Sequence, residues 1–248
     1  MLKFFRTIRK KLIEEDNVRK YLFYAIGEIL LVVIGILIAL QVNNWNEERK
    51  DQQQAETYVQ LLIEDLNADL NKYNTDIAIL SEIVDKKVAL QAHFDTAAVN
   101  RDSMRETLPL LQDRVVNFDE PNTSTIQALL ASGNIELLPD HVALAIRELR
   151  QLQTEIIVNE AEDLRILQNM YIEILTNVPF QIRESALFND ELVLDRLWEL
   201  RSEDEQVLLV YGFFTIRLIS DRRSLGRYMD VRDETVRVLS VLNTYMEN

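Results

Sequence analysis

A single carboxylate interrupts the most apolar stretch of this 248-residue chain. Glu28 is the one charged residue in the run from Tyr21 to Leu40, which reads YLFYAIGEILLVVIGILIAL. Because a carboxyl group is costly to place among hydrocarbon, a residue of this kind is a candidate for function. Gly35 and Ala39 follow Glu28 at helical spacing, and the Gly35-x-x-x-Ala39 pattern is typical of helices that pack closely in membranes.

Two interpretations of Glu28 stay open at this point. In the first, Glu28, Gly35 and Ala39 form one helix-packing face, on which the carboxyl group is protonated or paired with a partner group. A role in a proton or ion path would be a special case of that interpretation. In the second, Glu28 is only about two helical turns from the cytoplasmic end of the run, so its side chain reaches the lipid headgroups.

A cluster of acidic residues further along resembles the opening of a calcium-binding loop. Asp65, Asn67 and Asp69 occupy the first, third and fifth positions, and Asp76 falls at the twelfth. However, Leu70 stands at the sixth position, where such loops need glycine, and the twelfth residue is not glutamate. The segment also lies in an apolar helical repeat, which would point these side chains to different faces. We therefore predict solvated helix faces here and no calcium site.

No other pattern indicates catalysis, metal binding or cofactor binding. The two histidines, His93 and His141, have no partner at a metal-binding spacing and are expected at the surface or near a helix cap. Phosphate-binding, dinucleotide-binding and nucleophile-elbow motifs are missing, and the chain has no cysteine. An enzyme whose groups come from distant helices would leave no such pattern. The sequence therefore predicts no catalytic, metal-binding or cofactor-binding residues.

The apolar run around Glu28 is long enough to cross a membrane, because twenty helical residues span roughly 30 Å. The first twenty residues carry seven basic and three acidic side chains, whereas the rest of the chain carries 20 basic and 38 acidic ones. Basic flanks stay in the cytoplasm, so we expect a bacterial inner-membrane protein with a cytoplasmic N-terminus and a periplasmic C-terminal part. A cleaved signal peptide is the main alternative, but no small-residue cleavage site follows Leu40.

These features divide the chain into three parts. Residues 1–20 are expected to form a basic amphipathic head on the cytoplasmic leaflet, or else a disordered retention signal. Residues 21–42 form the predicted transmembrane helix, and residues 43–248 form a periplasmic domain that is large enough for one hydrophobic core. Three aromatic residues flank the span as expected interfacial anchors: Tyr21, Tyr24 and Trp45.

The periplasmic part is predicted to be all-α. Its apolar residues recur at steps of three and four, and its glycines and prolines are scarce, which favours helices over a turn-rich β fold. Three long helices with shorter ones between them would pack as an elongated bundle. The first long helix has no breaker before it, so it can continue from the span. Its apolar positions are Val59, Leu62, Leu66, Leu70, Tyr73, Ile77, Leu80, Val84 and Val88.

Several residues mark expected helix ends in this part. Gly133 is predicted to close a helix in a left-handed conformation, with a positive φ. Asp140 follows Pro139 and is expected to cap the next helix. The charged segment from Asp221 to Arg223 interrupts the apolar stripe of the last helix and would allow a kink there. Three serines precede a Glu or Gln by three residues, which is the capping-box pattern: Ser103, Ser124 and Ser202.

Two stretches resemble an uncharacterised family of bacterial single-pass membrane proteins. The first, MLKFFRTIRKKLIEEDNVRKYLFYAIGEILLVVIGILIALQVNNWNEERK, has a basic head, a YAIGEI-type span and an I-A-L-Q-x-N-N-W-N-E exit. The second, FDEPNTSTIQALLASGNIELLPD, has a threonine-rich helix start that leads to S-G-N-x-E-L. The resemblance implies a membrane-anchored helical protein of unknown function, and it supplies no catalytic residues. It also implies a recurring module that contains Glu28, Gln41, Asn43, Asn44 and Trp45.

Two kinds of function fit these observations. The first is a non-enzymatic anchored protein whose periplasmic bundle acts in scaffolding, interaction or assembly. Its expected partners are the lipid bilayer and either a second copy or another membrane protein. The second is a ligand-sensing domain, which would need a membrane signalling partner because twenty cytoplasmic residues hold no output domain. An enzyme that uses carboxylates on the bundle is a third hypothesis, and the acidic body argues against nucleic-acid binding.

Overall fold

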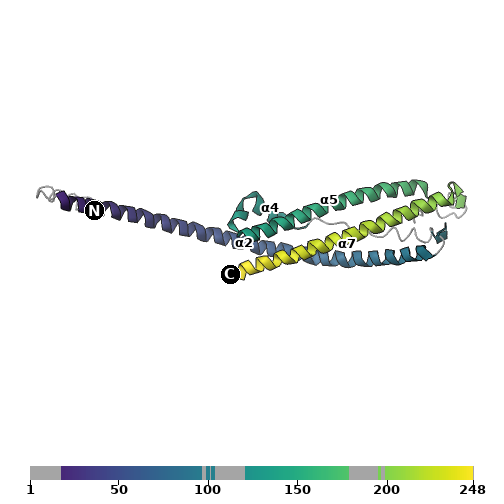
Figure 1. Ribbon diagram of the computed structural model, residues 1–248, viewed down its shortest axis with the longest axis horizontal. Coiled ribbons are helices and arrows are strands. Elements are labelled where there is room, and N and C mark those ends of the chain that lie inside the picture. The colour runs from purple at the N-terminus through teal and green to yellow at the C-terminus, as the bar shows by residue number, and fades with distance from the viewer. Residues whose placement is uncertain are drawn as a thin grey trace. The chain divides into compact units, whose positions relative to one another are not determined.

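The structure is a computed structural model. It describes residues 18–96, 99–100, 102–103, 121–178, 195–196 and 199–247. The regular elements in these ranges are α2 (Val18–Thr96), α4 (Ser124–Ala131), η2 (Asn134–Leu137), α5 (Asp140–Asn177) and α7 (Glu203–Glu247), shown in Figure 1. All of them are helical, which confirms the all-α prediction for this part of the chain. The amphipathic head predicted at residues 1–20 lies outside the described residues, apart from its last three positions.

The first helix, α2, continues without a break from the apolar run into the rest of the chain, as its lack of breakers predicted. The chain divides into two compact units, residues 1–57 and 58–248, and each is described by itself. In the first unit, α2 is long and apolar enough to cross a membrane, and none of its most apolar window is buried. The large aliphatic side chains between Leu22 and Leu40 are 44–72% exposed. Exposed apolar side chains over this length are typical of a helix that faces lipid.

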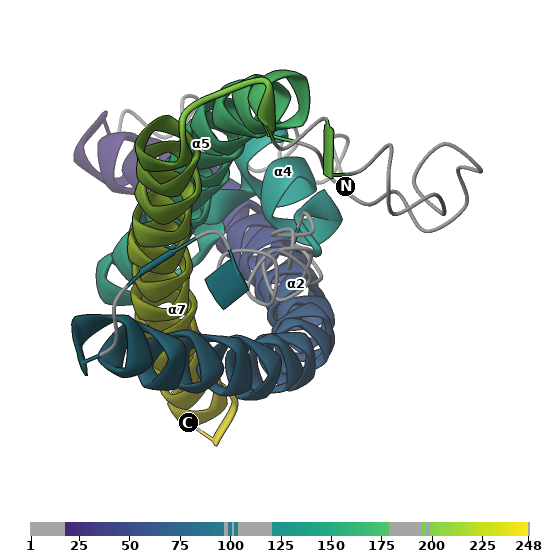
Figure 2. The ribbon, with the colours of Figure 1, turned by 90° about the vertical axis from the view of Figure 1, so that its right-hand side faces the viewer.

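The second unit is a bundle of long helical segments. α5 and α7 lie side by side (Figure 1 and Figure 2), and side chains of the 58–96 segment of α2 contact α7. Seven of the nine apolar positions predicted for α2 are buried. The exceptions are Leu70, which is half-buried, and Val88, which is 37% exposed. Their polar neighbours Asp69 and Lys87 take the inward positions instead.

Two helix ends have the predicted geometry. α7 begins at Glu203, and the Glu205 N–H donates to the Ser202 Oγ at 3.4 Å. Gly133, between α4 and η2, has a φ of 75°, in the left-handed region. A Cβ atom at Gly133 would meet no other atom within 4 Å. The requirement for glycine at this position is therefore a matter of backbone conformation and not of space.

Two other predicted caps are wrong by one residue. Thr123, and not Ser124, is the N-cap of α4, and Pro139 is the N-cap of α5. Neither N-cap residue makes a side-chain capping hydrogen bond. Asp140 is instead the first helical residue of α5, where its negative charge still favours the N-terminal end of the helix dipole. Glu106, the expected partner in the remaining capping box, lies outside the described residues.

The charged segment near the middle of α7 does not end the helix. α7 is one continuous helix from Glu203 to Glu247, and Asp221 within it is buried and not solvated. Asp221 can occupy an inward position because it is paired with basic groups there. Towards the start of α7, its aromatic side chains pack into an apolar cluster that all three long helices share: Val84, Phe94, Leu167, Ile174, Val178, Val210, Phe213, Phe214 and Leu218.

Candidate functional site

The predicted membrane-packing residues lie on α2 in the first unit. Glu28 is half-buried, whereas Gly35 and Ala39 are exposed. A Cβ atom at Gly35 would meet no other atom within 4 Å. The side of α2 that carries these small residues therefore has room for lipid or for another helix. Its role in helix packing stays a prediction.

The predicted interfacial aromatics lie at the two ends of the same segment. Tyr24 is half-buried and Trp45 is 60% exposed, while the side chain of Tyr21 lies outside the described residues. Beside Trp45, the Asn43 Nδ2 donates to the Glu47 Oε1 at 3.1 Å. This polar pair on the helix surface follows directly after the apolar run. The change from apolar to polar side chains is what a membrane interface at this level would require.

In the second unit, two acidic side chains of α2 hold the start of α4. The backbone N–H of Asn122 donates to Asp69 Oδ1 at 3.0 Å and to Oδ2 at 3.1 Å. The Asn122 Nδ2 also donates to Asp69 Oδ1, at 2.9 Å. One turn earlier on α2, Asp65 Oδ2 accepts a hydrogen bond of 2.6 Å from the Thr125 Oγ1. Both carboxylates therefore lie near the N-terminal end of α4, where negative charge is favoured.

The solvated faces predicted at this acidic cluster are wrong for these two residues. Asp69 is 2% exposed and Asp65 is half-buried. Both belong to the inward side of α2, which also carries Leu66 and Tyr73. Burial raises the pKa of Asp69, and the hydrogen bonds from Asn122 offset this only in part. Among the described residues, no three His, Asp or Glu side chains are grouped so that they could hold a metal ion.

A buried polar layer joins all three long helices one turn beyond Asp69. Tyr73 on α2 and Tyr228 on α7 are each 1% exposed, and their rings meet edge to face with centroids 6.5 Å apart. Gln153 on α5 is fully buried and lies against Tyr73. Neither Nε2 nor Oε1 of Gln153 makes a hydrogen bond of normal geometry. Burial and the nearby Asp69 charge raise the pKa of Tyr73, and the Gln153 amide opposes this rise.

A buried ionic cluster lies beside the apolar cluster of the three helices. Lys87 Nζ on α2 contacts Asp221 Oδ2 on α7 at 2.6 Å. Arg217 Nε, one turn before Asp221, lies 3.3 Å from the other carboxylate oxygen. The three side chains are between 2% and 8% exposed. One carboxylate is therefore shared by two cations in a region that water hardly reaches.

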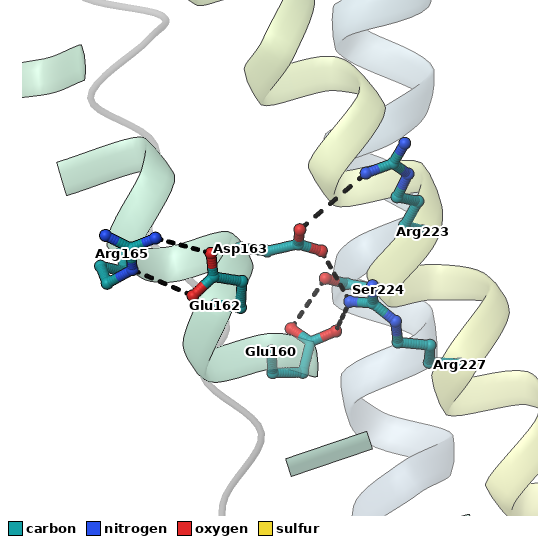
Figure 3. A network of polar contacts seen from close by, with 7 residues as sticks. All are labelled: Glu160, Glu162, Asp163, Arg165, Arg223, Ser224 and Arg227. Atoms are coloured by element: carbon teal, nitrogen blue, oxygen red, sulfur yellow. Dashed lines mark hydrogen bonds and ion pairs between the residues drawn. The ribbon is translucent and has the colours of Figure 1, made fainter. Parts of the chain in front are cut away.

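A second polar network connects α5 to α7 (Figure 3). Arg227 Nη1 donates to Glu160 Oε1 and to Asp163 Oδ2, both at 2.7 Å. The Ser224 Oγ donates to Glu160 Oε2 at 2.8 Å, and Arg223 lies 4.0 Å from Asp163. The Arg227, Glu160 and Asp163 side chains are 13–20% exposed, so this network keeps contact with water.

Most of the buried and partly buried polar contacts described above join different segments of the bundle. Such an arrangement suits a role in fixing the register of the helices, because each group is costly to bury away from its partner. The sequence analysis missed these residues, although a signal was present. Each of three follows a buried leucine or valine by three or four positions, which places it on the inward face: Lys87 after Val84, Gln153 after Leu149, and Asp221 after Leu218.

A comparison with protein families matches residues 28–165, more than half of the chain, to a family of unknown function. The chain belongs to the DUF6090 family. Membership of a family of unknown function is consistent with the resemblance, while the membrane signature stays a prediction. The DUF6090 match includes Asp65, Asp69 and Asn122, so the whole contact between α2 and the start of α4 lies within the family segment. Neither a curated protein nor a solved structure matches the chain.

Proposed function

We propose that this DUF6090 protein is a non-enzymatic, membrane-anchored interaction protein. Residues 21–42 cross the bacterial inner membrane, the basic N-terminus stays in the cytoplasm, and residues 43–248 form a periplasmic helical bundle. The bundle serves in scaffolding or assembly, and the face of α2 that carries Glu28, Gly35 and Ala39 brings copies of the chain together in the membrane.

One observation carries the anchoring part of this proposal. The most apolar window of α2 has a mean hydropathy of 2.6 and none of it is buried. In a water-soluble helix, an apolar stretch of this length would be covered by other parts of the protein. Lipid supplies that cover if the helix spans a bilayer. The excess of basic residues before the run supports the cytoplasmic placement of the N-terminus.

The association part rests on the composition of one helix face. Gly35 and Ala39 leave room for a second backbone to approach, as small residues four apart do in membrane helices. Glu28 lies on the same side by helical periodicity. A carboxyl group within a membrane is costly unless polar groups lie around it, and a second chain packed on this face could add such groups.

Disulfide cross-linking in native membranes tests the association, because the chain contains no cysteine of its own. Ala39→Cys places a thiol on the proposed face. Leu37→Cys is the matched control, since residue 37 lies half a turn away from Glu28 by helical periodicity. After mild oxidation, we expect a dimer of the 29.0 kDa chain from Ala39→Cys and little from Leu37→Cys.

The same assay carries three further substitutions. Glu28→Ala and Gly35→Leu, each combined with Ala39→Cys, should lower the dimer yield, and Glu28→Gln should lower it less because an amide still forms hydrogen bonds. Equal yields from Ala39→Cys and Leu37→Cys would contradict self-association through this face. The alternative is a ligand-sensing domain that docks on a signalling partner. In that case, a photoreactive group attached to the thiol of Ala39→Cys should cross-link the chain to a second protein.

A further inference from the structure

The helices of the bundle are not all held by interactions of the same kind. The ion pairs between α5 and α7, from Arg227 to Glu160 and Asp163, have side chains that are 13–20% exposed. The ion pair between α2 and α7, from Lys87 to Asp221, has side chains that are only 2% and 8% exposed. Desolvation makes a fully buried pair contribute little net stability, whereas a partly hydrated pair avoids much of that cost.

The buried side chain of Gln153 also lowers the stability of the contact between α2 and α5. Gln153 is fully buried, and both polar atoms of its amide lack a hydrogen bond of normal geometry. A buried amide in this state loses its hydration without full compensation, which costs stability in the closed bundle. The side chain lies against Tyr73 of α2. When α2 moves away, water can form hydrogen bonds with the amide. These hydrogen bonds stabilise the open state relative to the closed state.

We propose that the segment Asp69–Lys87 of α2 is the element of the bundle that opens, while α5 and α7 stay paired. The buried amide of Gln153 and the desolvated Lys87–Asp221 pair lower the free energy of this opening relative to that of global unfolding. The opening segment belongs to the helix that also carries the apolar run. The bundle thereby contains a two-state element that a partner could bias by binding one state.

Hydrogen–deuterium exchange of the full-length chain in detergent micelles tests this inference. In the wild type, amides of Asp69–Lys87 should exchange faster than those of residues 228–242 of α7. Gln153→Leu and Gln153→Met replace the buried amide with an apolar side chain, and both should slow exchange in Asp69–Lys87 by about tenfold. Gln151→Leu is the matched control, because Gln151 is exposed two residues away and its Nε2 donates to Glu155 Oε1. That variant should leave exchange unchanged.

Three outcomes would overturn the inference. The first is wild-type exchange in Asp69–Lys87 that is as slow as in residues 228–242. The second is exchange in Asp69–Lys87 that stays at the wild-type rate or becomes faster in both Gln153→Leu and Gln153→Met. The third is slowing of the same size in Asp69–Lys87 and in residues 228–242, which would show that the substitutions act on global unfolding and not on a separate opening of α2.

Discussion

The carboxylate of Asp69 accepts the backbone N–H of Asn122 at 3.0 Å, and these two residues lie 53 positions apart in the chain. This contact fastens the start of α4 to the first long helix of the bundle. Asp65 adds a second contact through the hydroxyl of Thr125. Both contacts lie within residues 28–165, which match the DUF6090 family. In this chain, the part that matches the family therefore contains both sides of the contact between α2 and α4.

Removing the Asp69 carboxylate should destabilise the bundle. Asp69→Ala leaves the Asn122 N–H near the buried site without its acceptor, so we expect the free energy of unfolding to fall by about 2 kcal/mol or more. Asp69→Asn should cost less, because its amide oxygen can still accept one hydrogen bond. Urea unfolding followed by circular dichroism measures both. Glu64→Ala, at an exposed position on the same helix, is the control, and an equal loss in that variant would contradict the assignment.

Much of the fold follows from local sequence patterns. Seven of the nine positions that the apolar spacing predicted in α2 are buried, and the scarcity of breakers predicted that α2 would run on from the apolar stretch. The positive φ of Gly133 also followed from its place after an apolar helix. These features depend on periodicity and backbone sterics, which act over a few residues and can be recognised in the sequence.

The polar contacts between helices did not follow from the same patterns. Asp69 and Lys87 lie on the inward face of α2. Charged residues are seldom buried unless they are paired, so their burial was not expected from the sequence. Whether a charged residue is buried depends on a partner far away in the chain, Asn122 for Asp69 and Asp221 for Lys87. Each residue meets its partner only because the helices pack together in the folded bundle. For that reason the sequence analysis treated Asp69 as solvated and did not identify Lys87.

The stability of the bundle should depend on pH through Asp69. Burial raises the pKa of Asp69 above its ordinary value of 3.8, so the folded state binds this proton more tightly than the unfolded state. The contribution of Asp69 to the free energy of unfolding is therefore greatest at low pH and is lost as the pH rises through the raised folded-state pKa. The free energy of unfolding of the wild type minus that of Asp69→Asn should therefore fall as the pH rises above the ordinary pKa of an aspartate.

Parallel urea titrations of the two proteins at a series of pH values measure that difference. Asp69→Asn is the suitable reference because it keeps the size of the side chain and removes its titration. A difference that grows as the pH rises would show that the hydrogen bonds from Asn122 outweigh burial. The pKa of Asp69 would then be lowered and not raised in the folded state.

Asp221 and Lys87 should contribute unequally to the stability of the buried ionic cluster. Asp221→Ala removes the carboxylate that Lys87 and Arg217 share, and we expect a loss of at least about 3 kcal/mol in the free energy of unfolding. Lys87→Met keeps the contact between Asp221 and Arg217 and fills the space with an apolar side chain, so its cost should be clearly smaller. Chemical unfolding of both variants tests this order. Equal losses would show that the carboxylate is not the centre of the cluster.

Gly133 should tolerate only residues that accept a positive φ. Gly133→Val should lower the free energy of unfolding by at least about 1 kcal/mol, because a β-branched side chain is strained in the left-handed region. Gly133→Asn should cost less, since asparagine adopts this conformation more readily. No atom lies within 4 Å of the position of a Cβ atom there, so crowding would not confuse the comparison. An unchanged melting temperature in Gly133→Val would contradict the prediction.

The central claim is that one uncleaved helix anchors a periplasmic bundle, and thiol labelling tests it most directly in a chain without cysteine. Single substitutions Thr7→Cys and Ser240→Cys report on the N-terminus and on the exposed surface of α7. With a membrane-impermeant maleimide added to intact spheroplasts, we expect Ser240→Cys to be labelled at once and Thr7→Cys only after the membrane is disrupted. Protection of Ser240→Cys in intact spheroplasts, or loss of the Thr7→Cys thiol from the mature protein, would contradict the account.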